Sequence, residues 1–488
     1  MERMSLFIGG TRADAKEGDT TDVVEAATGR VMGRVMLGGA ADIDAAVTAA
    51  EAASASWAAF DPRERADVLV RFADHLTARA GETAALVSRQ NGMPITLSTG
   101  ANGHFPGIIL RYYADLVRDG REPDVRPGMR GTRTRVERTP VGVVGAITPW
   151  NYPQTLAAMK YAPALAAGCA VVLKPPPETA LDAHVLAEAA EAAGLPPGVL
   201  NIVPGGRDTG VHLVAHPGVA KVAFTGSTAA GRAIGAVCGR LLKPVTLELG
   251  GKSAAILLDD VDLPSYLARL PRVSLPNAGQ TCHSSTRILA PRARYDEIVD
   301  AVTATVRGLT VGDPLDPATQ IGPMVSSEQR RRVLDYIDLG RAEGARLTTG
   351  GGIPADRDAG WFVEPTVFAD VDNSWRVAQE EIFGPVLCVI PYDGVEEAVR
   401  LANDSEYGLA GTVWTSDEER GIAVARRVHT GSIGVNHFGL DPAAPFGGWK
   451  ASGLGTELGP EGLEAYLRPK SIYLPAASRR ERTRKEPA

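Results

Sequence analysis

The chain has 488 residues, of which 44% are hydrophobic and 22% charged, a composition typical of a globular protein too long for one hydrophobic core. Its formal net charge of −7 provides no basic surface for nucleic acid or for an anionic membrane, so we expect neither partner. The apolar runs are shorter than the ~20 residues that span a bilayer, and the N-terminus lacks a basic patch leading into an apolar stretch, which favours a cytoplasmic protein of two or three domains.

The earliest element with a clear boundary is a helix. Asp61 can cap it, Pro62 suits its first turn, and Glu64 supplies a first-turn acid before the largely apolar run 66–80. We therefore expect the first hundred residues to be largely helical.

The segment 120–139 differs from what precedes it, because it is rich in Arg, Gly and Pro and ends in alternating Thr, Arg and Val. This pattern predicts two exposed strands that project from the domain and whose free edge needs a partner. A second copy of the chain would supply one, so we expect a homodimer or homotetramer. Near the C-terminus, the basic run from Arg479 to Lys485 has no apolar periodicity, which is typical of a solvated end.

From residue 141 onward, short apolar runs alternate with alanine-rich segments of helical character. The alternation is typical of crossover units and predicts an α/β fold with a doubly wound parallel sheet. Gly250-Gly251 interrupts the pattern, and we expect a second α/β domain after it. The apolar runs span 141–147, 169–173, 201–203, 222–224 and 245–247. The predicted domains are 1–119 with 140–250, then 251–450, while 120–139 and 451–488 form a small β arm and a tail.

Four cysteines occur, Cys169, Cys238, Cys282 and Cys388, and none lies in a CxxC pair. The spacing indicates neither a disulfide framework nor a zinc knuckle, and it favours a reducing compartment. Cys282 lies in the stretch Asn-Ala-Gly-Gln-Thr-Cys-His, whose small and polar residues suit a nucleophile better than a packing cysteine. His283 follows directly, but neighbours on an extended chain point opposite ways, so we interpret it as a satisfied or solvent-facing histidine.

Glu248 stands between two leucines at the end of an apolar run, directly before Gly250-Gly251. Burial there would raise its pKa and make it a useful general base. A structural carboxylate that accepts hydrogen bonds from nearby N–H groups explains the position equally well.

Two other positions could bind parts of a nucleotide. Gly226-Ser227-Thr228 turns a strand into a helical segment, and such a turn attracts anions, although an ordinary helix cap would have the same residues. Lys174 ends an apolar run, where ligands gather in open parallel sheets, and a surface lysine is the alternative. The usual GxGxxG fingerprint is missing from the sequence.

No metal centre is expected. His212 and His216 have helical spacing. The glutamate of an HExxH motif and a third ligand are both missing, so the pair is not interpreted as a zinc site.

Taken together and in this order, these signals resemble the aldehyde dehydrogenase superfamily over nearly the whole chain. The separation between Glu248 and Cys282 also matches that of the family. The resemblance implies a coenzyme domain, a catalytic domain and an oligomerisation arm, which correspond to the three predicted parts. The matching motifs are Trp150-Asn151-Tyr152-Pro153, the strand end at Lys174, Phe224-Thr225-Gly226-Ser227-Thr228, Glu248-Leu249-Gly250-Gly251-Lys252, Gly279-Gln280-Thr281-Cys282, Glu380-Glu381-Ile382-Phe383-Gly384-Pro385 and Pro445-Phe446-Gly447-Gly448.

The resemblance implies an enzyme that oxidises an aldehyde to a carboxylic acid. Cys282 would be the nucleophile, Glu248 the general base, and Asn151 with the Cys282 backbone N–H the oxyanion hole. Thiolate attack gives a thiohemiacetal, hydride transfer to the nicotinamide gives a thioester, and water activated by Glu248 hydrolyses it. Lys160, at the family's second lysine position, is expected to help lower the pKa of Cys282.

The resemblance also implies NAD as the cofactor, with NADP as the alternative. The family places the adenine ribose near Lys174 and the pyrophosphate at the helix after Gly226 and Ser227. The nicotinamide ribose would lie on Glu381. The expected cofactor contacts are Trp150, Lys174, Gly226, Ser227, Thr228, Gly231, Glu381 and Phe383.

One position departs from the family pattern. Many relatives carry a glutamate three residues after the lysine, where it binds the ribose hydroxyls, whereas this chain has Pro177 there and Glu178 one residue later. A shift of one residue on an extended chain turns the side chain away, so we expect Glu178 to help little. The missing carboxylate predicts only a modest preference for NAD, and Arg207 is either a phosphate partner or a solvated loop residue.

The hydrolytic reaction has three alternatives. A CoA-acylating relative would lack the base at Glu248, which argues against that reaction. A semialdehyde dehydrogenase is disfavoured because no arginine stands out as a carboxylate clamp, and the intact catalytic residues disfavour a non-catalytic protein on the same fold. The expected tunnel lining is apolar and aromatic, which predicts an aliphatic, terpenoid or aromatic aldehyde. Its residues are Tyr152, Leu156, Met159, Phe438 and Leu440.

Overall fold

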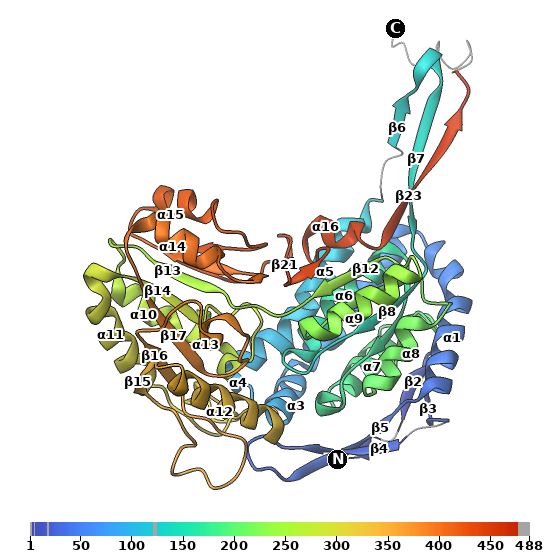
Figure 1. Cartoon of the computed structure of the whole chain (residues 1–488). Coiled ribbons are helices and arrows are strands. Elements are labelled where there is room, and N and C mark those ends of the chain that lie inside the picture. The colour runs from blue at the N-terminus through green and yellow to red at the C-terminus, as the bar shows by residue number, and fades with distance from the viewer. Residues whose placement is uncertain (1, 4, 17–18, 121–123, 477–488) are drawn as a thin grey trace.

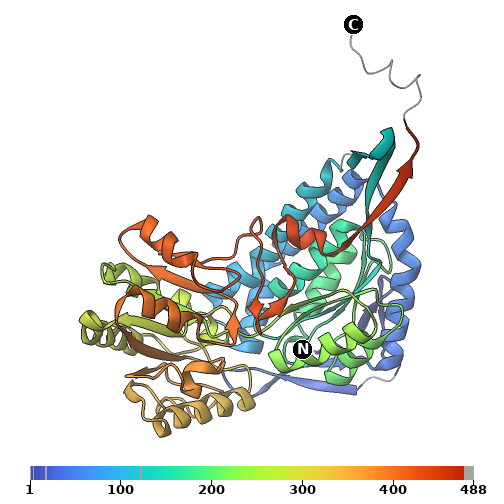
Figure 2. The ribbon, with the colours of Figure 1, turned by 45° about the horizontal axis from the view of Figure 1, so that its top comes forward.

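The computed structural model describes residues 2–3, 5–16, 19–120 and 124–476 (Figure 1). The basic run from Arg479 to Lys485 therefore lies outside the described residues. Two lobes, each built on a large sheet, lie side by side, and a narrow β arm projects from one of them (Figures 1 and 2). Within the described ranges, no helix combines the length and the apolar character that a membrane crossing requires.

The first sheet contains the parallel strands that the sequence predicts. Its order is β22, β12, β11, β8, β9, β10, β2 and β3, and the five strands from β12 to β10 are parallel. Their side chains are almost entirely buried, which explains the uninterrupted apolar runs. Because β8 comes first in sequence yet lies between β9 and β11, a topological switch point forms at its carboxyl end. The strands span Leu6–Ile8 (β2), Thr11–Ala13 (β3), Val143–Ile147 (β8), Ala170–Lys174 (β9), Leu200–Ile202 (β10), Lys221–Thr225 (β11), Val245–Glu248 (β12) and Gly453–Leu454 (β22).

Helices cover both faces of the first sheet. Val144 and Ala146 of β8 pack in one buried cluster with α2, α5 and α6. Val143 and Ile147 point to the opposite face and pack with α1, α8 and α9. This two-sided core holds the carboxyl ends of the strands at fixed positions. The helices span Ala40–Ala58 (α1), Pro62–Ala78 (α2), Ala80–Asn91 (α3), Phe105–Arg118 (α5), Pro153–Ala167 (α6), Ala183–Ala192 (α7), Arg207–Ala215 (α8) and Thr228–Arg240 (α9).

The N-terminal region is helical only from residue 40 onward. The expectation of a largely helical first hundred residues is wrong for residues 6–37, which contribute β2, β3 and the antiparallel pair β4 (Asp19–Val24) and β5 (Val31–Leu37). Branched Thr and Val side chains in β4 favour the extended backbone. The predicted helix start is confirmed, since the Asp61 carboxylate caps α2 by accepting from the Arg63 N–H at 2.8 Å.

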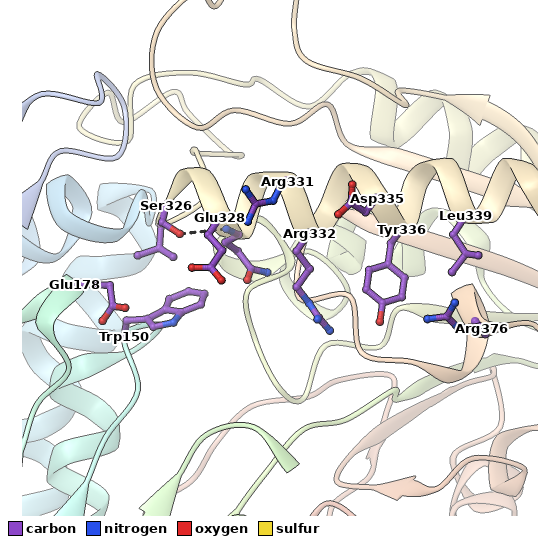
Figure 3. Close-up of a pocket in the computed structure, with 12 residues that line it drawn as sticks. Trp150, Glu178, Ser326, Glu328, Arg331, Arg332, Asp335, Tyr336, Leu339 and Arg376 are labelled. Carbon is purple, nitrogen blue, oxygen red and sulfur yellow. Dashed lines mark hydrogen bonds between the residues drawn. The ribbon is translucent and has the colours of Figure 1, made fainter. Parts of the chain in front are cut away.

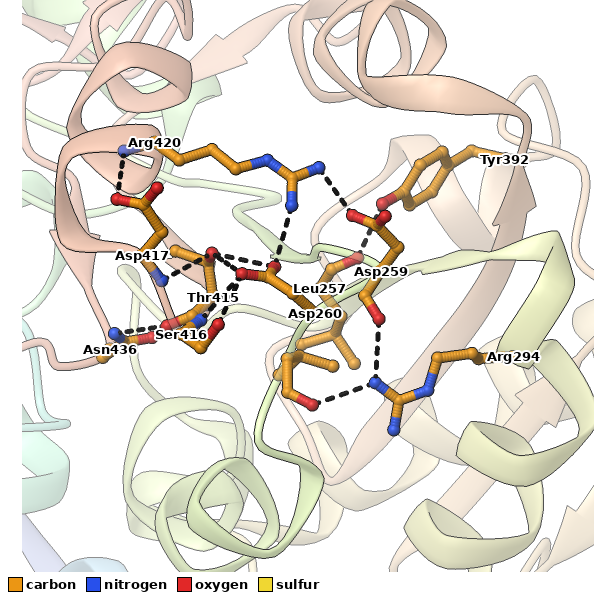
Figure 4. Close-up of polar contacts among 11 residues, drawn as sticks. Leu257, Asp259, Asp260, Arg294, Tyr392, Thr415, Ser416, Asp417, Arg420 and Asn436 are labelled. Carbon is orange, nitrogen blue, oxygen red and sulfur yellow. Dashed lines mark hydrogen bonds and ion pairs between the residues drawn. The ribbon is translucent and has the colours of Figure 1, made fainter.

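The second sheet has its own switch point. Its order is β15, β16, β17, β14, β13, β19 and β20, and every neighbouring pair except β15 with β16 is parallel. At the carboxyl ends of β13 and β19, Asp260 accepts hydrogen bonds from Thr415 and Ser416, and Arg420 pairs with Asp259 and Asp260 (Figure 4). The strands span Ala254–Leu257 (β13), Arg287–Pro291 (β14), Arg346–Thr349 (β15), Thr366–Ala369 (β16), Val386–Tyr392 (β17), Gly411–Trp414 (β19) and Gly434–Val435 (β20), and the covering helices span Leu263–Val273 (α10), Tyr295–Arg307 (α11), Ser327–Ala342 (α12), Gly394–Asn403 (α14) and Glu418–Ala425 (α15).

The arm contains the two predicted strands and a third that the sequence analysis missed. β6 (Asp124–Pro127) and β7 (Arg133–Pro140) are antiparallel, and β23 (Leu467–Leu474) pairs with β7 along its whole length (Figure 2). The C-terminal segment is therefore divided, because β22 pairs with β12 of the first sheet. We retain the predicted domain boundaries as a proposal, with β22 assigned to the sheet of the first domain.

Candidate active site

The loop before β14 holds Cys282 in an unusual backbone. Asn277, Ala278 and Gly279 have φ angles of 52°, 53° and 75°, so three successive residues adopt the left-handed region. Gly279 is required there, because a Cβ would lie 2.1 Å from the carbonyl oxygen of Gly384. Left-handed backbone costs an alanine about 1–2 kcal/mol and persists where the surroundings enforce it. The tight loop fixes where the sulfur lies.

Cys282 is half-buried and carries a protonated sulfur at neutral pH. Loss of solvent, with smaller contributions from the charges of Glu381 and Glu248, raises its pKa to about 12. The backbone N–H groups of His283 and Cys282 act in the opposite direction by stabilising the thiolate.

Asn151 follows β8 and faces the Cys282 loop. Its side-chain Nδ2 donates to the carbonyl oxygen of Gln280 at 3.1 Å, two residues before the cysteine. Its Oδ1 is buried and has no hydrogen-bond partner among the described residues. One of the two amide hydrogens is thus left for another acceptor, as an oxyanion donor requires.

Glu248 ends β12, and the residue is 3% exposed. Neither of its oxygens has a hydrogen-bond partner within the described part of the chain. Burial and the charge of Glu457 raise its pKa well above the ordinary value, while Lys160 opposes the shift. The structural alternative, a carboxylate that accepts from nearby N–H groups, is therefore not what the structure shows.

Lys160 lies on α6 and is fully buried. Its Nζ donates to Glu457 at 2.7 Å and to the Thr225 hydroxyl at 2.6 Å. Its positive charge opposes the upward shifts in the pKa values of Glu248 and Glu457. The expectation that Lys160 helps to lower the pKa of Cys282 stays a prediction. Sequence reasoning missed Glu457, since nothing in the stretch Gly-Thr-Glu-Leu-Gly signals a buried acid.

A cavity of about 600 Å³ opens between the two lobes (Figure 3). Trp150 and Glu178 line it on the side of the first sheet, and α12 of the second lobe forms the opposite wall. Trp150 meets Phe383 edge to face, with ring centroids 5.4 Å apart. The side chains from α12 and beyond it are Ser326, Glu328, Gln329, Arg331, Arg332, Asp335, Tyr336, Leu339 and Arg376.

Glu381 lies over the Gly250-Gly251 turn. Its Oε1 accepts from the Gly251 N–H at 3.0 Å, and a Cβ on Gly250 would lie 2.6 Å from its Oε2. Burial raises its pKa to about 7 despite that hydrogen bond. The predicted ribose-binding carboxylate and the turn after Glu248 are thus brought together.

The predicted phosphate turn begins α9 at the switch point. A Cβ on Gly226 would lie 2.4 Å from the Phe224 ring, and the Ser227 hydroxyl caps the helix by accepting from the Ala230 N–H. The Thr228 hydroxyl donates to the Ala451 carbonyl at 3.4 Å and is engaged within the protein. Gly231 is buried, where a Cβ would lie 2.4 Å from Leu249, so this position lets α9 pack closely on the sheet.

Lys174 ends β9, as predicted, and is buried. Its Nζ donates to the Gly205 carbonyl at 2.5 Å, and burial lowers its pKa to about 8. Pro177–Thr179 forms a short 3₁₀ turn, so the assumption of an extended chain is wrong there. Glu178 lines the large cavity and lies beside Trp150, contrary to the expectation that it turns away (Figure 3).

The structure divides the five residues of the predicted tunnel lining into two groups. Tyr152, Phe438 and Leu440 are partly exposed and pack with Cys282 against the same apolar cluster. Phe438 and Leu440 line a cavity of about 430 Å³. Met159 is fully buried in the core, and Leu156 is nearly so, because α6 turns both residues inward.

Three histidines were singled out in the sequence. His283 packs on Phe438 with ring centroids 5.0 Å apart, and its buried Nδ1 has no partner in the residues that the structure describes. Burial lowers its pKa to about 4, so the ring is neutral. The residue is partly exposed, so it faces solvent only in part, and its Nδ1 is not satisfied. His212 and His216 both face Asp44. The described residues contain no group of three His, Cys, Asp or Glu side chains that could hold a metal ion.

The fold and the site together define an α/β oxidoreductase with a doubly wound sheet. The sequence profile of the aldehyde dehydrogenase family matches residues 13–472. The chain is 54% identical to a geranial dehydrogenase from Castellaniella defragrans, covering 97% of this chain and 99% of that protein. It is 40% identical to a betaine aldehyde dehydrogenase from Rhizobium etli, covering 97% of each. The chain therefore belongs to the aldehyde dehydrogenase family.

Solved structures agree with this assignment. An aldehyde dehydrogenase from Mycobacterium tuberculosis complexed with NAD+ matches with a TM-score of 0.95 and 48% identity, covering 98% of this chain and 99% of that chain. An aldehyde dehydrogenase C mutant from Pseudomonas syringae, complexed with NAD+ and octanal, matches with a TM-score of 0.93 and 39% identity over 96% of each chain. The predicted family, fold class, enzyme class and the family's nicotinamide cofactor are thereby confirmed.

Proposed function

We propose that this enzyme oxidises an apolar aldehyde to its carboxylic acid with NAD(P)+, using Cys282 and Glu248 in successive steps. The observation that carries the proposal is the Glu248 carboxylate. It is buried, unpartnered among the described residues and close enough to Cys282 for its charge to raise the pKa of the thiol. A buried carboxylate without partners costs stability, and its retention is explained by a chemical task.

The first step forms a bond between Cys282 and the aldehyde carbon. The Cys282 thiol gives its proton to water, and the thiolate attacks the carbonyl, whose oxygen takes the negative charge. Asn151 Nδ2 and the Cys282 backbone N–H are the donors for that oxygen. Donors fixed before the reaction stabilise the alkoxide, and removing one typically costs about 10²–10³-fold in rate.

The site fits a nicotinamide dinucleotide. The cavity between the lobes reaches Trp150 and Glu178, the N-terminus of α9 lies at the switch point, and Glu381 lies over a turn with no side chains. Lys174, Ser227 and Glu381 would hold the cofactor by its two riboses and its pyrophosphate. The bound nicotinamide supplies the hydride acceptor that oxidises the thiohemiacetal to a thioester.

The last step needs a base, because neutral water attacks a thioester slowly near pH 7. Glu248 takes a proton from water, and the resulting hydroxide adds to the thioester carbon. Collapse of the adduct breaks the carbon–sulfur bond, releases the carboxylic acid and returns the Cys282 sulfur. The raised pKa of Glu248 makes it a stronger base than an exposed carboxylate, at the cost of being protonated over a wider pH range.

The substrate is proposed to have an apolar chain. The cavity of about 430 Å³ contains Phe438, whose ring packs on His283 directly after Cys282. Leu440, Phe446 and Leu458 also line it, and its only acid among the described residues is Asp441. No arginine lines it among the described residues, which disfavours semialdehydes. The names of two similar proteins, a geranial dehydrogenase and an octanal complex, support an apolar aldehyde as the substrate.

The decisive experiment is rapid mixing with Glu248→Gln. If Glu248 serves hydrolysis only, the variant gives a burst of NADH of about one equivalent per site, followed by turnover about 10²–10⁴-fold slower than the parent. Glu396→Gln, which changes an exposed acid on α14, is the matched control and keeps parental turnover. Normal turnover of Glu248→Gln, or a requirement for coenzyme A, would overturn the hydrolytic mechanism.

A substrate panel tests the second part of the proposal. Octanal and geranial should have kcat/KM values at least about tenfold above those of betaine aldehyde and succinic semialdehyde, because the charged compounds lose hydration without gaining a partner. Equal or reversed values would favour the semialdehyde or betaine aldehyde alternative.

We also propose a cytoplasmic homo-oligomer. The four cysteines are free, as suits a reducing compartment. The arm presents the edges of β6 and β23, which a second copy of the chain would cover.

A further inference from the structure

We propose that Asn277 is a positioning residue that sets the distance between Asn151 and Cys282. The inference rests on the proposed function, since it assumes that these two residues act on one aldehyde. It concerns a side chain that makes no contact with the substrate in the proposed mechanism.

Asn277 links the two lobes at the reacting centre. It belongs to the loop of the second lobe, is 1% exposed, and donates from its Nδ2 to the backbone carbonyl of Asn151 at 3.1 Å. Asn151 belongs to the first lobe, because it follows β8. The bond therefore crosses the boundary that separates the oxyanion donor from the nucleophile.

A second hydrogen bond runs in the opposite direction between the same segments. The Asn151 side chain donates to the carbonyl of Gln280, three residues after Asn277 and two before Cys282. Two opposed bonds restrict both sliding and rotation of one segment against the other, which a single bond cannot do. The Gln280 Oε1 accepts from the Val325 N–H at 3.0 Å, so the loop is also fixed from its far side.

The carbonyl of Asn151 receives a further donor from the first lobe. Asn91, the last residue of α3, donates from its Nδ2 to the carbonyls of Trp150 and Asn151, both at 3.0 Å. Asn91 thus fixes this peptide to its own lobe, and Asn277 fixes it to the cysteine loop. Of these two donors, Asn277 is the one that joins this carbonyl to the other lobe.

The backbone conformation alone does not explain an asparagine at position 277. Asn tolerates the left-handed region better than most residues, but Ala278 adopts the same region with φ 53°. The buried Oδ1 of Asn277 also lacks a partner among the described residues, which penalises the amide. The hydrogen bond from the Asn277 side chain to the Asn151 carbonyl therefore explains the asparagine at this position.

The position matters because oxyanion stabilisation depends steeply on geometry. A displacement near 1 Å at a reacting centre can reduce the rate by about 10²-fold. Without the Asn277 donor, the two segments keep the Asn151–Gln280 bond and the bond between the Tyr152 and Thr281 hydroxyls at 2.9 Å, but the carbonyl of Asn151 is no longer held to the cysteine loop.

Asn277→Gly tests the inference, because glycine accepts φ 52° without strain and removes only the amide. The matched control is Ala278→Gly, which relaxes the neighbouring left-handed residue and leaves the amide in place. We expect the first-turnover rate of NADH formation to fall about 10–100-fold in Asn277→Gly and less than about twofold in Ala278→Gly, with KM for the aldehyde and the melting temperature little changed in both. Asn277→Asp, which keeps the size and the backbone preference without a donor, should resemble Asn277→Gly.

A double-mutant cycle separates positioning from general structural damage. If Asn277 acts through Asn151, Asn277→Gly should cost less than about threefold in an Asn151→Ala background. An equal cost in both backgrounds, or equal rates in Asn277→Gly and Ala278→Gly, would overturn the inference. A different result would contradict the proposed function itself: a parent enzyme that forms no acid from aldehydes, or a Cys282→Ala variant that retains its turnover.

Discussion

The two large sheets carry equivalent switch points with opposite chemistry. In the second sheet, the polar side chains after β13 and β19 satisfy one another: Asp260 accepts from Thr415 and Ser416 and pairs with Arg420, and Asn436 exchanges hydrogen bonds with Thr415 (Figure 4). In the first sheet, the corresponding region holds Glu248 and Asn151, whose side-chain oxygens lack partners among the described residues.

The pKa values express the same contrast. Hydrogen bonds from Ser416 and Thr415 and the charge of Arg420 outweigh the opposing effect of burial and lower the pKa of Asp260. Burial and the charge of Glu457 raise the pKa of Glu248. A switch point can therefore serve as a structural cluster or as a reactive site. The difference depends on which polar groups are left without partners.

The largest effect is expected at the nucleophile. Cys282→Ala should lower kcat by more than about 10³-fold, because the other three cysteines are buried in the two cores. Cofactor affinity, measured by titration of protein fluorescence, should stay within about twofold of the parent. Cys388→Ala, in the core of the second sheet, is the control and should keep parental kcat/KM. Substantial turnover in Cys282→Ala would contradict the assignment of a catalytic role to the site at the first sheet.

The next effect concerns the acid that faces the cavity. Glu178 lines it beside Trp150, and a carboxylate there should repel the 2′-phosphate of NADP. Glu178→Gln should therefore lower the ratio of kcat/KM for NAD to that for NADP by about 5–100-fold, and Pro177→Glu should raise it. Glu191→Gln, an exposed acid at the end of α7, should leave the ratio unchanged. If neither substitution changed the NAD-to-NADP ratio of kcat/KM, another side chain would discriminate between the two cofactors at the ribose.

A smaller effect is expected at the switch point of the second sheet, where the polar side chains are paired. Asp260→Ala leaves Thr415 and Ser416 without their acceptor, so the free energy of unfolding should fall by about 1–3 kcal/mol in urea denaturation. The kcat/KM should remain within about twofold of the parent, since the cluster lies outside the proposed site. Asp338→Ala, which removes an exposed acid on α12, should not change stability measurably. Loss of catalysis without loss of stability would contradict the assignment of a structural role.

The smallest effect is a pH dependence of opposite sign at the two sites. The pKa of Glu248 is raised in the folded protein, so the parent loses stability as the pH rises from the unfolded-state pKa through the folded one, and Glu248→Gln does not. The melting temperature of Glu248→Gln, relative to that of the parent, should therefore rise by roughly 1–2 °C between pH 5 and pH 8. The pKa of Asp260 is lowered, so its contribution is present at neutral pH and is lost in acid. Scanning calorimetry across the pH range would detect both trends, and two parallel pH profiles would contradict them.

Local sequence order was sufficient for several parts of the molecule. The run of five parallel strands, the cap of α2 by Asp61 and the turn at Gly226 depend on neighbouring residues, so composition and spacing identify them. The polar setting of Cys282 and the strand-end position of Glu248 are likewise visible in the chain. These features indicated a doubly wound sheet and a cysteine site before any tertiary contact was known.

Other parts were decided only by tertiary structure, because their partners are distant in sequence. Lys160 meets Glu457 across 297 residues, and the buried pair lies close enough to Glu248 for both charges to act on its pKa. Glu178 faces the cavity because a 3₁₀ turn replaces the extended chain, and β23 completes the arm from the opposite end of the protein. Sequence patterns record which residues are apolar or can turn. Which polar groups are paired, and which remain available for chemistry, is determined when the packed lobes bring them together.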